Sequence, residues 1–248
     1  MKKNKRGQIT IFIILGLLIL IVLFFLFRGN FQIIESKTPI LRIEDCVEQG
    51  LEIEQLNEQG GSFNPEFYYL YKGDKIQYLC YTDEYYKTCV MQKPLLKQEI
   101  EKEINSKINP ILSNCVDSVK SDLEKEGYSV RLGNLNSDIK IIPENIVIEI
   151  SDVLETEKNG KTNYENLKIN IPSKLYEMTM IASSISNWEA HYGDSETMNY
   201  MIYYPNIKVE KKKQGEGTTI YILTNRLTLD KFQFASRSLV IPPGVTGL

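Results

Sequence analysis

The stretch Ile9-Thr-Ile-Phe-Ile-Ile-Leu-Gly-Leu-Leu-Ile-Leu-Ile-Val-Leu-Phe-Phe-Leu-Phe27 decides the architecture of this chain. It carries no charge, and as a helix it is long enough to cross the hydrocarbon core of a bilayer. Basic residues flank it, four before it and one directly after it: Lys2, Lys3, Lys5, Arg6 and Arg28. The positive-inside rule therefore predicts a single-pass plasma-membrane protein with a cytoplasmic N-terminus and an extracytoplasmic domain.

Two interpretations of this N-terminus stay open. One is a permanent signal anchor in contact with the lipid bilayer through residues 9–27. The other is a class III leader, because Lys5-Arg6-Gly7 followed by Gln8 resembles the site that prepilin peptidases cut, between Gly7 and Gln8. Phe12 departs from that pattern, since many pilins carry Glu at this position. A secretory signal peptide fits less well, because the apolar run is long and no A-x-A-like site follows it.

The rest of the chain is acidic. Residues 1–28 hold five basic residues and no acid, which leaves 24 basic and 32 acidic residues and a net charge of −8 beyond them. This balance disfavours nucleic acid as a partner. We expect five segments, the last two of which form one continuous domain: 1–7 basic N-terminus, 8–28 transmembrane helix, 29–37 linker, 38–127 helical and hairpin half, and 128–248 β-rich half.

The four cysteines all follow the apolar run, so they face a compartment in which disulfides persist. Apolar residues recur at helical spacing after Thr38-Pro39 and again from Pro94 to about Glu126, and Cys46 and Cys115 lie on or beside these apolar faces. The favoured pairing is therefore Cys46–Cys115 between the two helices, with Cys80–Cys89 nested inside it. The spacing of the four cysteines and the single histidine does not match that of zinc ligands.

The two predicted helices have expected ends. Gly60-Gly61 should end the first, and Gly127 the second. Pro110 disfavours the α conformation at Asn109, so a kink or a break is expected there.

Tyrosines crowd the segment between these helices. Strand-favouring residues on either side of Lys72-Gly73-Asp74-Lys75 predict a β-hairpin, with Gly73-Asp74 suited to its turn. Because strand side chains alternate between two faces, some of these rings should face away from the core, where they suit contacts with a surface protein or a glycan; the alternative is that the rings pack in the core. The candidate binding residues are Tyr68, Tyr69, Tyr71, Tyr78, Tyr81, Tyr85 and Tyr86.

The remaining chain alternates strand and helix patterns. Asn159-Gly160 predicts a hairpin with a type I′ turn. The expected strands are 129–132, 139–142, 145–150, 166–171, 206–212, 218–223 and the stretch 232–241, and the expected helices are 172–191 and one from 194 to before Pro205. The fold class is α+β: a transmembrane helix, then an exported domain with a disulfide-linked helix pair, a Tyr-rich hairpin and an antiparallel sheet with one or two further helices.

No motif predicts catalysis, a metal or a cofactor. His191 is the only histidine, and Ser183, Ser184 and Ser186 form no nucleophile elbow. The acid pairs Glu44-Asp45 and Asp83-Glu84 are typical of solvated faces. Gly215 and Gly217 lie in a turn that lacks the lysine and serine of a P-loop.

Four motifs carry a family resemblance: Lys5-Arg-Gly-Gln-Ile-Thr-Ile-Phe-Ile-Ile14, Ile43-x-x-Cys46-Val47, Ile111-Leu112-x-x-Cys115-Val116 and Phe234-Ala235-x-Arg237-Ser238-x-x-x-Pro242-Pro243. Together they resemble uncharacterised single-pass membrane-anchored surface proteins of small-genome archaea. The resemblance implies an anchor, an exported α+β domain and paired cysteines, and no particular reaction. We expect a structural or partner-binding ectodomain without enzymatic activity or a small-molecule substrate. The alternatives are a pilin-like filament subunit processed after Gly7 and, third, an exported hydrolase.

Overall fold

The computed structural model describes residues 15–21 and 38–241. The chain divides into two compact units, Met1–Thr38 and Pro39–Leu248. In the first unit residues 15–21 are helical, within the predicted apolar segment, whereas Gly7, Gln8 and the rest of 9–27 lie outside the described residues. Within the described part of the chain, no helix combines the length and the apolar character needed to cross a membrane.

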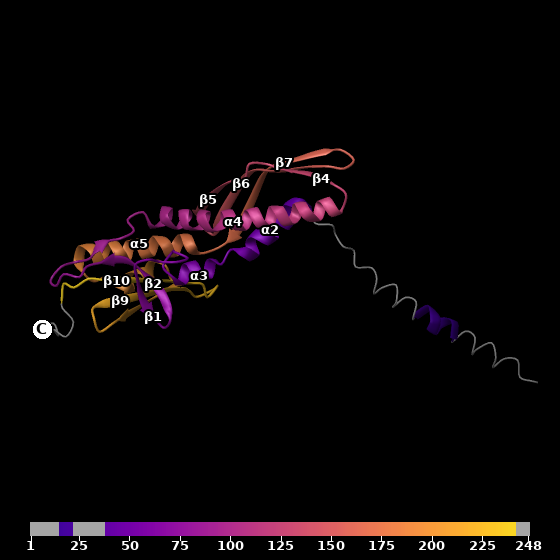
Figure 1. The fold of residues 1–248 in the computed structure, drawn as a ribbon. Helices are drawn as coiled ribbons and strands as arrows, with labels where there is room; N and C mark the ends of the chain where they lie inside the picture. The colour runs from indigo at the N-terminus through magenta and orange to yellow at the C-terminus, as the bar shows by residue number, and fades with distance from the viewer. Residues whose placement is uncertain (1–14, 22–37, 242–248) are drawn as a thin grey trace, which may run out of the picture. The chain divides into compact units, whose positions relative to one another are not determined.

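The second unit has an α+β fold with two sheets (Figure 1). The six-stranded sheet has the order β1-β2-β10-β9-β8, with β3 also paired to β2. Its strands are β1 (Tyr68–Tyr71), β2 (Asp74–Tyr81), β3 (Val90–Met91), β8 (Ile207–Lys213), β9 (Thr218–Asn225) and β10 (Lys231–Arg237). The sheet thus joins strands from both predicted halves, 38–127 and 128–248. It differs from the predicted antiparallel sheet in one place, because β2 and β10 run parallel.

The second sheet has four antiparallel strands, with β4 and β5 on one side of β6 and β7 on the other. Its strands are β4 (Ser129–Leu132), β5 (Asn136–Ile142), β6 (Asn145–Glu157) and β7 (Lys161–Pro172). The hairpin predicted at Asn159-Gly160 is confirmed, but Glu157 pairs with Lys161, so the loop has three residues instead of the two of a type I′ turn.

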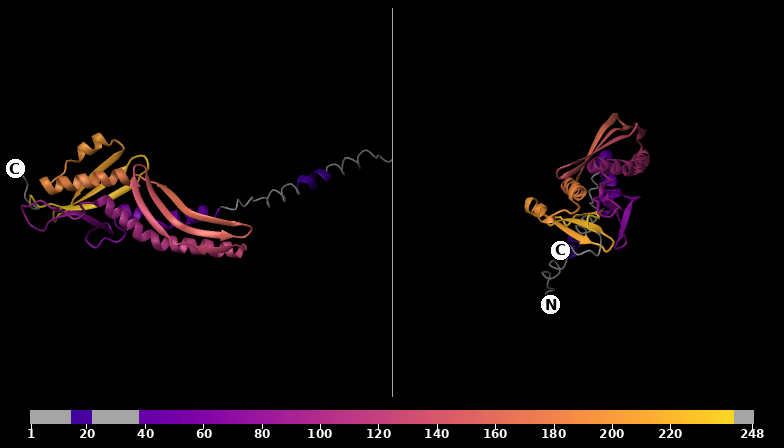
Figure 2. Two further views of the ribbon diagram at one scale, coloured as in Figure 1. Left: turned by 90° about the horizontal axis from the view of Figure 1, so that it is seen from above. Right: turned by 90° about the vertical axis from the view of Figure 1, so that its left-hand side faces the viewer.

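Five helices pack on these sheets. They are α2 (Pro39–Gly50), α3 (Ile53–Glu58), α4 (Leu96–Lys125), α5 (Leu175–Tyr192) and α6 (Thr197–Tyr203). Figures 1 and 2 show α4 along the four-stranded sheet and α5 on the six-stranded sheet. One apolar core runs between both layers and includes Ile104 of α4, Ile148 of β6 and Phe234 of β10.

The first predicted helix is divided in two, which corrects the expectation that it would continue to Gly60-Gly61. The helix α2 ends at Gly50, and α3 starts at Ile53. A Cβ atom at Gly50 would lie 2.7 Å from Cγ2 of Ile111, so the absence of a side chain lets α2 approach α4 closely. Glycine is also a weak helix former, and the chain turns directly after this contact.

Of the kink or break predicted at Asn109-Pro110, the break is absent, because α4 continues through both residues. Both residues are exposed, whereas Ile108 and Leu112 on the opposite face are buried in the core. The proline removes one helical hydrogen bond, but the buried stripe on either side keeps the helix docked. The Ser137 hydroxyl at the start of β5 also lies 2.6 Å from Asn105 Oδ1 and 2.8 Å from Asn109 Oδ1, and its one proton can be donated to either oxygen.

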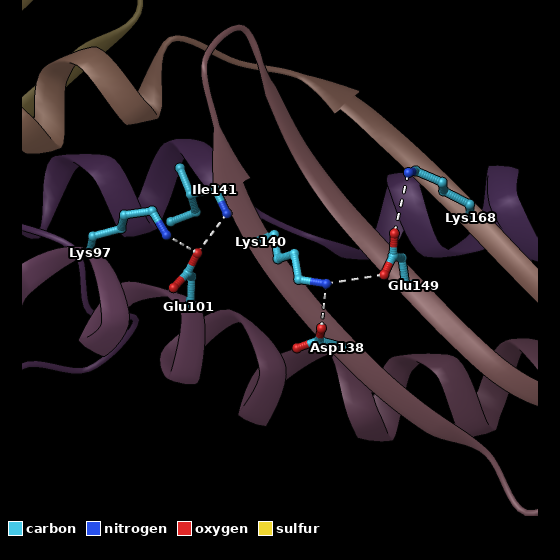
Figure 3. A network of polar contacts seen from close by, with 7 residues as sticks. All are labelled: Lys97, Glu101, Asp138, Lys140, Ile141, Glu149 and Lys168. Carbon is cyan, nitrogen blue, oxygen red and sulfur yellow. Dashed lines mark hydrogen bonds and ion pairs between the residues drawn. The ribbon is translucent and has the colours of Figure 1, made fainter.

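A polar network fixes β5 to α4 (Figure 3). The Glu101 carboxylate accepts a hydrogen bond of 2.8 Å from the backbone N–H of Ile141, on the edge of β5 that no strand covers. Lys97 lies 2.5 Å from the same carboxylate. Across the sheet, Lys140 bridges Asp138 and Glu149 at 2.9 and 3.2 Å. The edge amide is therefore satisfied by a side chain of the covering helix.

The two predicted disulfides are present. Cys46–Cys115 joins α2 to α4 with a Cα–Cα distance of 5.8 Å, and Cys80–Cys89 closes the loop after β2. The tyrosine-rich hairpin is β1–β2. Its two-residue turn consists of Lys72 and Gly73, with φ of 55° and 103°, instead of the predicted Gly73-Asp74. Both central residues have positive φ, as a tight hairpin turn requires.

Candidate functional site

The predicted tyrosine block divides into a packed part and an exposed part. In the packed part, Tyr78 is only 6% exposed, and its hydroxyl lies 2.8 Å from Thr218 Oγ1. Its ring centroid is 4.9 Å from that of Phe67 and 5.0 Å from that of Tyr81. This cluster covers the face of the six-stranded sheet opposite the helices, together with Ile220 and other apolar residues.

The tyrosines of β1 differ from one another in solvent exposure. Tyr69 and Tyr71 are half-buried against the same cluster, whereas Tyr68 is exposed. Lysines lie over two of these rings, with Lys75 Nζ 4.9 Å from the Tyr68 centroid and Lys72 Nζ 5.3 Å from the Tyr71 centroid. Such contacts hold the rings against the hairpin.

The Cys80–Cys89 loop presents the other two tyrosines to solvent. Backbone hydrogen bonds fasten it to the chain after β10: Tyr86 N–H donates to Leu239 C=O at 2.7 Å, and Leu239 N–H donates to Lys87 C=O at 3.0 Å. Thr82 N–H donates to Arg237 C=O at 2.9 Å. With the disulfide at its base, the loop is held at both ends and in the middle, so Tyr85 and Tyr86 are fixed in place although their side chains are exposed.

Tyr86 has an unusual backbone conformation, with φ of +61°. Residues with a Cβ atom avoid this left-handed region, at a cost of roughly 1–2 kcal/mol. Such strain persists where the surroundings determine it, and it is often found at binding sites.

Apolar residues from two other segments continue this surface. A Cβ atom at Gly193, the C-cap of α5 with φ of +79°, would lie 2.1 Å from Val240 Cγ2, so the chain after β10 packs directly on the end of α5. On α5, the rings of Trp188 and Tyr192 lie 4.5 Å apart. We call this region the end surface, and it consists of Tyr85, Tyr86, Trp188, Tyr192, Val240 and Ile241, which are 39–76% exposed.

A hollow of about 230 Å³ lies within the end surface. It is lined on one side by Tyr192, Val240 and Ile241, and on the other by polar residues that include Glu189 and Lys213. A hollow with an apolar border and a few polar groups suits the insertion of one side chain of a partner.

The polar side of this hollow rests on a buried cluster. Glu189 is 2% exposed and accepts a hydrogen bond from the Tyr221 hydroxyl. Burial raises the pKa of Glu189 above its usual range, and the hydrogen bond from Tyr221 and the charge of Lys211 partly oppose this. Burial, and then the neighbouring Glu189, also raise the pKa of Tyr221. Lys211 pairs with Asp194 and donates to Ser195 C=O at 3.1 Å, which fixes the α5–α6 connection to β8.

Two other candidates from the sequence lie beside the end surface: the His191 ring is 6.2 Å from that of Tyr192, and Gly217 lines the hollow. His191 Nδ1 hydrogen-bonds to the backbone C=O of Asn187 at 2.8 Å, and the His191 side chain is exposed. Gly215 and Gly217 lie in the β8–β9 turn, as predicted. Over residues 15–21 and 38–241, no group of three or more His, Cys, Asp or Glu side chains is placed to hold a metal ion.

Sequence reasoning found Tyr85 and Tyr86 but missed Trp188, Tyr192, Val240 and Ile241. The helix pattern places Trp188 on the apolar stripe of the helix expected over 172–191, whereas in the structure its side chain is exposed, and Tyr192 lies just beyond the expected end of that helix. Their proximity to the loop depends on the chain after β10, which no local pattern reveals. Comparison of the chain with protein-family models, with curated proteins and with solved structures found no match.

Proposed function

We propose that this chain is a single-pass membrane-anchored protein whose extracytoplasmic domain binds a partner protein through the end surface. The uncharged apolar segment 9–27 with its basic N-terminal flank supports the anchor. The end surface carries the binding proposal, because it gathers six exposed apolar side chains from three separate segments of the chain.

The composition of the end surface favours a protein partner. Tyrosine and tryptophan are enriched among the residues that dominate binding energy in protein interfaces. The backbone of Tyr86 is held by the disulfide-closed loop and by its hydrogen bond to Leu239, so little backbone conformational entropy remains to be lost on binding. The hollow beside Tyr192 offers a place for one inserted side chain of the partner.

The arrangement of the domain leaves this surface accessible. In Figure 1 the C-terminal part of β10 and the far end of α5 lie at one end of the domain, whereas α2, at which the chain enters, lies in the half that holds the four-stranded sheet. The end surface and the first helix of the domain therefore lie in different parts of it.

Photo-cross-linking tests the proposal in the full-length chain in its native membranes. A benzophenone amino acid at Tyr86 or at Tyr192 is expected to give the same discrete cross-linked protein, and Trp188→Ala should reduce its yield at least fivefold. The matched control is the same probe at Tyr68, an exposed tyrosine of the hairpin. Equal cross-linking from Tyr68, or none from Tyr86 and Tyr192, would refute binding by the end surface.

The pilin-like alternative rests on Lys5-Arg6-Gly7-Gln8, which lies outside the described residues. Mass spectrometry of the N-terminal peptide from membranes distinguishes the two. A mature start at Gln8 supports a processed, filament-forming subunit, whereas a start at Met1 or Lys2 supports a permanent anchor.

A further inference from the structure

Two adjoining hollows follow the short helix α3, on a part of the domain separate from the end surface. The larger, of about 650 Å³, and the smaller, of about 380 Å³, share Ile53, Glu54, Glu58 and Ile171 in their linings. We call them together the α3 groove. It runs from the C-terminal end of α2 past α3 to the loop between β9 and β10, where Asp230 lines it.

The groove is strongly acidic. Its carboxylates come from α2, α3, β2 and the loops beside them: Glu48, Glu52, Glu54, Glu58, Asp74 and Asp230. Among the described residues, the larger hollow has no basic side chain in its lining, and the smaller has only Lys231. Within the described part of the chain, none of these six acids forms an ion pair. This differs from the sheets, where Glu149 and Glu210 each bind two lysines.

Buried amide oxygens provide a second, independent sign of a ligand. Asn57 lines the smaller hollow and is 5% exposed, and its Oδ1 has no hydrogen-bond partner among the described residues. Gln59 lines the larger hollow, and its Oε1 is likewise buried and unpaired there. An unpaired buried acceptor costs about 1–3 kcal/mol, so a ligand that donates hydrogen bonds would relieve a defined penalty.

The electrostatics agree with these acceptors. The pKa of Glu58 is raised above its usual range, first by partial burial and then by the charges of Asp74 and Glu54. Carboxylates that repel one another and amide oxygens without donors both require the same complement, which is a positive charge that carries N–H groups. Lysine and arginine side chains have this chemistry.

The spacing of the acids distinguishes a chain of positive charges from a single ion. Over residues 38–241 no three acidic side chains converge closely enough to hold a metal ion. The carboxylates are instead distributed along the groove. They line two hollows whose walls come from several helices, strands and loops. We infer that the α3 groove binds a lysine- or arginine-rich segment of a partner protein.

Peptide binding tests this inference with the full-length chain in nanodiscs of zwitterionic lipid. The probe is fluorescently labelled hexalysine, and the readout is its anisotropy at low ionic strength. Glu54→Gln/Glu58→Gln is expected to weaken binding at least tenfold. The matched control, Asp117→Asn/Glu157→Gln, removes the same charge from two exposed acids outside the groove and should change the affinity less than twofold.

Three further readings complete the test. Hydrogen exchange of residues 53–59 should slow when hexalysine binds. Trp188→Ala should leave hexalysine binding unchanged, so failure of the groove and failure of the end surface are distinguishable. Equal weakening in the control variant would show binding to net charge alone and overturn the inference, as would displacement of the peptide by 1 mM Ca²⁺ beyond the effect of NaCl at matched ionic strength.

Discussion

The tyrosines between Phe67 and Tyr86 belong to one block of sequence but to two different environments. Tyr78 and Tyr81 pack with Phe67 on a face of the six-stranded sheet. Tyr85 and Tyr86, only a few residues later, stand exposed on a disulfide-closed loop. We call these the packed tyrosines and the presented tyrosines.

The difference between them lies in the backbone. The packed tyrosines lie on β2, whose neighbour β10 supplies a sheet surface for the rings to cover. The presented tyrosines follow the strand, where the backbone hydrogen bonds go to Leu239 and the side chains meet no covering layer. A tyrosine-rich segment thus stabilises the fold where a sheet continues beneath it, and it becomes available for binding where the sheet ends.

Replacing a packed tyrosine should have the largest effect. Tyr78→Ala removes a buried ring and its hydrogen bond to Thr218, and comparable deletions cost about 3–5 kcal/mol. Urea denaturation of the full-length chain measures this loss. Tyr85→Ala, in the exposed loop, should change the unfolding free energy by less than about 0.5 kcal/mol. Similar losses in the two variants would contradict the division into packed and presented tyrosines.

Removing the Cys80–Cys89 disulfide, which closes the loop of the presented tyrosines, should have the next largest effect. Cys80→Ser/Cys89→Ser opens a loop with a sequence separation of nine, which the chain-entropy model values at roughly 2–3 kcal/mol. Because the loop then loses its preorganisation, cross-linking from Tyr86 should fall while the packed cluster persists. Near-ultraviolet circular dichroism shows whether the packed cluster persists, and the cross-linking yield from Tyr86 measures the loss of preorganisation. Unchanged cross-linking would mean that the disulfide does not preorganise the presented tyrosines.

The sequence predicted local features better than their combination. Regular apolar spacing located α4 and α5 to within a few residues, and the placement of Cys46 and Cys115 beside two apolar stripes predicted their bridge. The expected end of the first helix was wrong, and the break offered as one alternative at Pro110 is absent, because tertiary contacts overrode local preference. The helix α2 ends where Gly50 meets Ile111, and α4 continues through Pro110 because its buried stripe holds both sides of it.

The candidate site was harder to predict, because its parts are distant in sequence. The parallel pairing of β2 with β10 brings residues 239–241 beside the loop of residues 81–88, and Gly193 then admits Val240 at the end of α5. None of these contacts has a local signature. The acids of the α3 groove were likewise visible only as charged residues, since Asp230 and Glu54 become neighbours only in the folded chain.

A third packed tyrosine provides a pH-dependent test. Tyr221 stacks on Phe234 with a centroid distance of 5.1 Å and donates to the buried Glu189. Because burial raises the folded-state pKa of Glu189 above 4.5, the stability linked to this group is fully present below that value and is lost as pH rises through the raised pKa. The Tyr221 hydroxyl limits that loss by hydrogen-bonding to the carboxylate.

Tyr221→Phe should therefore cost less at low pH, where the raised pKa of Glu189 favours its protonated form in the folded chain, than at higher pH. Once rising pH ionises Glu189, the buried carboxylate lacks its donor in this variant, and the cost should reach about 1.5–3 kcal/mol. Urea denaturation at low and at higher pH gives this difference. Tyr200→Phe is the matched control, because the Tyr200 hydroxyl bonds to Ser184 and no carboxylate, so its cost should be independent of pH. A cost of Tyr221→Phe that is equally independent of pH would rule out the coupling.

The smallest effect should come from the backbone of a presented tyrosine. With φ of +61°, Tyr86 occupies a conformation that glycine adopts freely and alanine does not. Tyr86→Gly should consequently be about 1 kcal/mol more stable than Tyr86→Ala, in spite of the greater flexibility of glycine in the unfolded chain. At Tyr85, where φ is not positive, the order should be reversed. Urea denaturation of the four variants compares both pairs.

The same variants separate stability from binding. Neither Tyr86→Gly nor Tyr86→Ala retains the aromatic ring, so both should lose partner affinity, whereas only the glycine variant relieves the strained backbone. A glycine variant that is at once more stable than the native chain and unable to bind would mean that the loop maintains its strain in order to hold the Tyr86 ring outward. If Tyr86→Ala proved the more stable of the two, the left-handed conformation would not be the state that the folded loop adopts in solution.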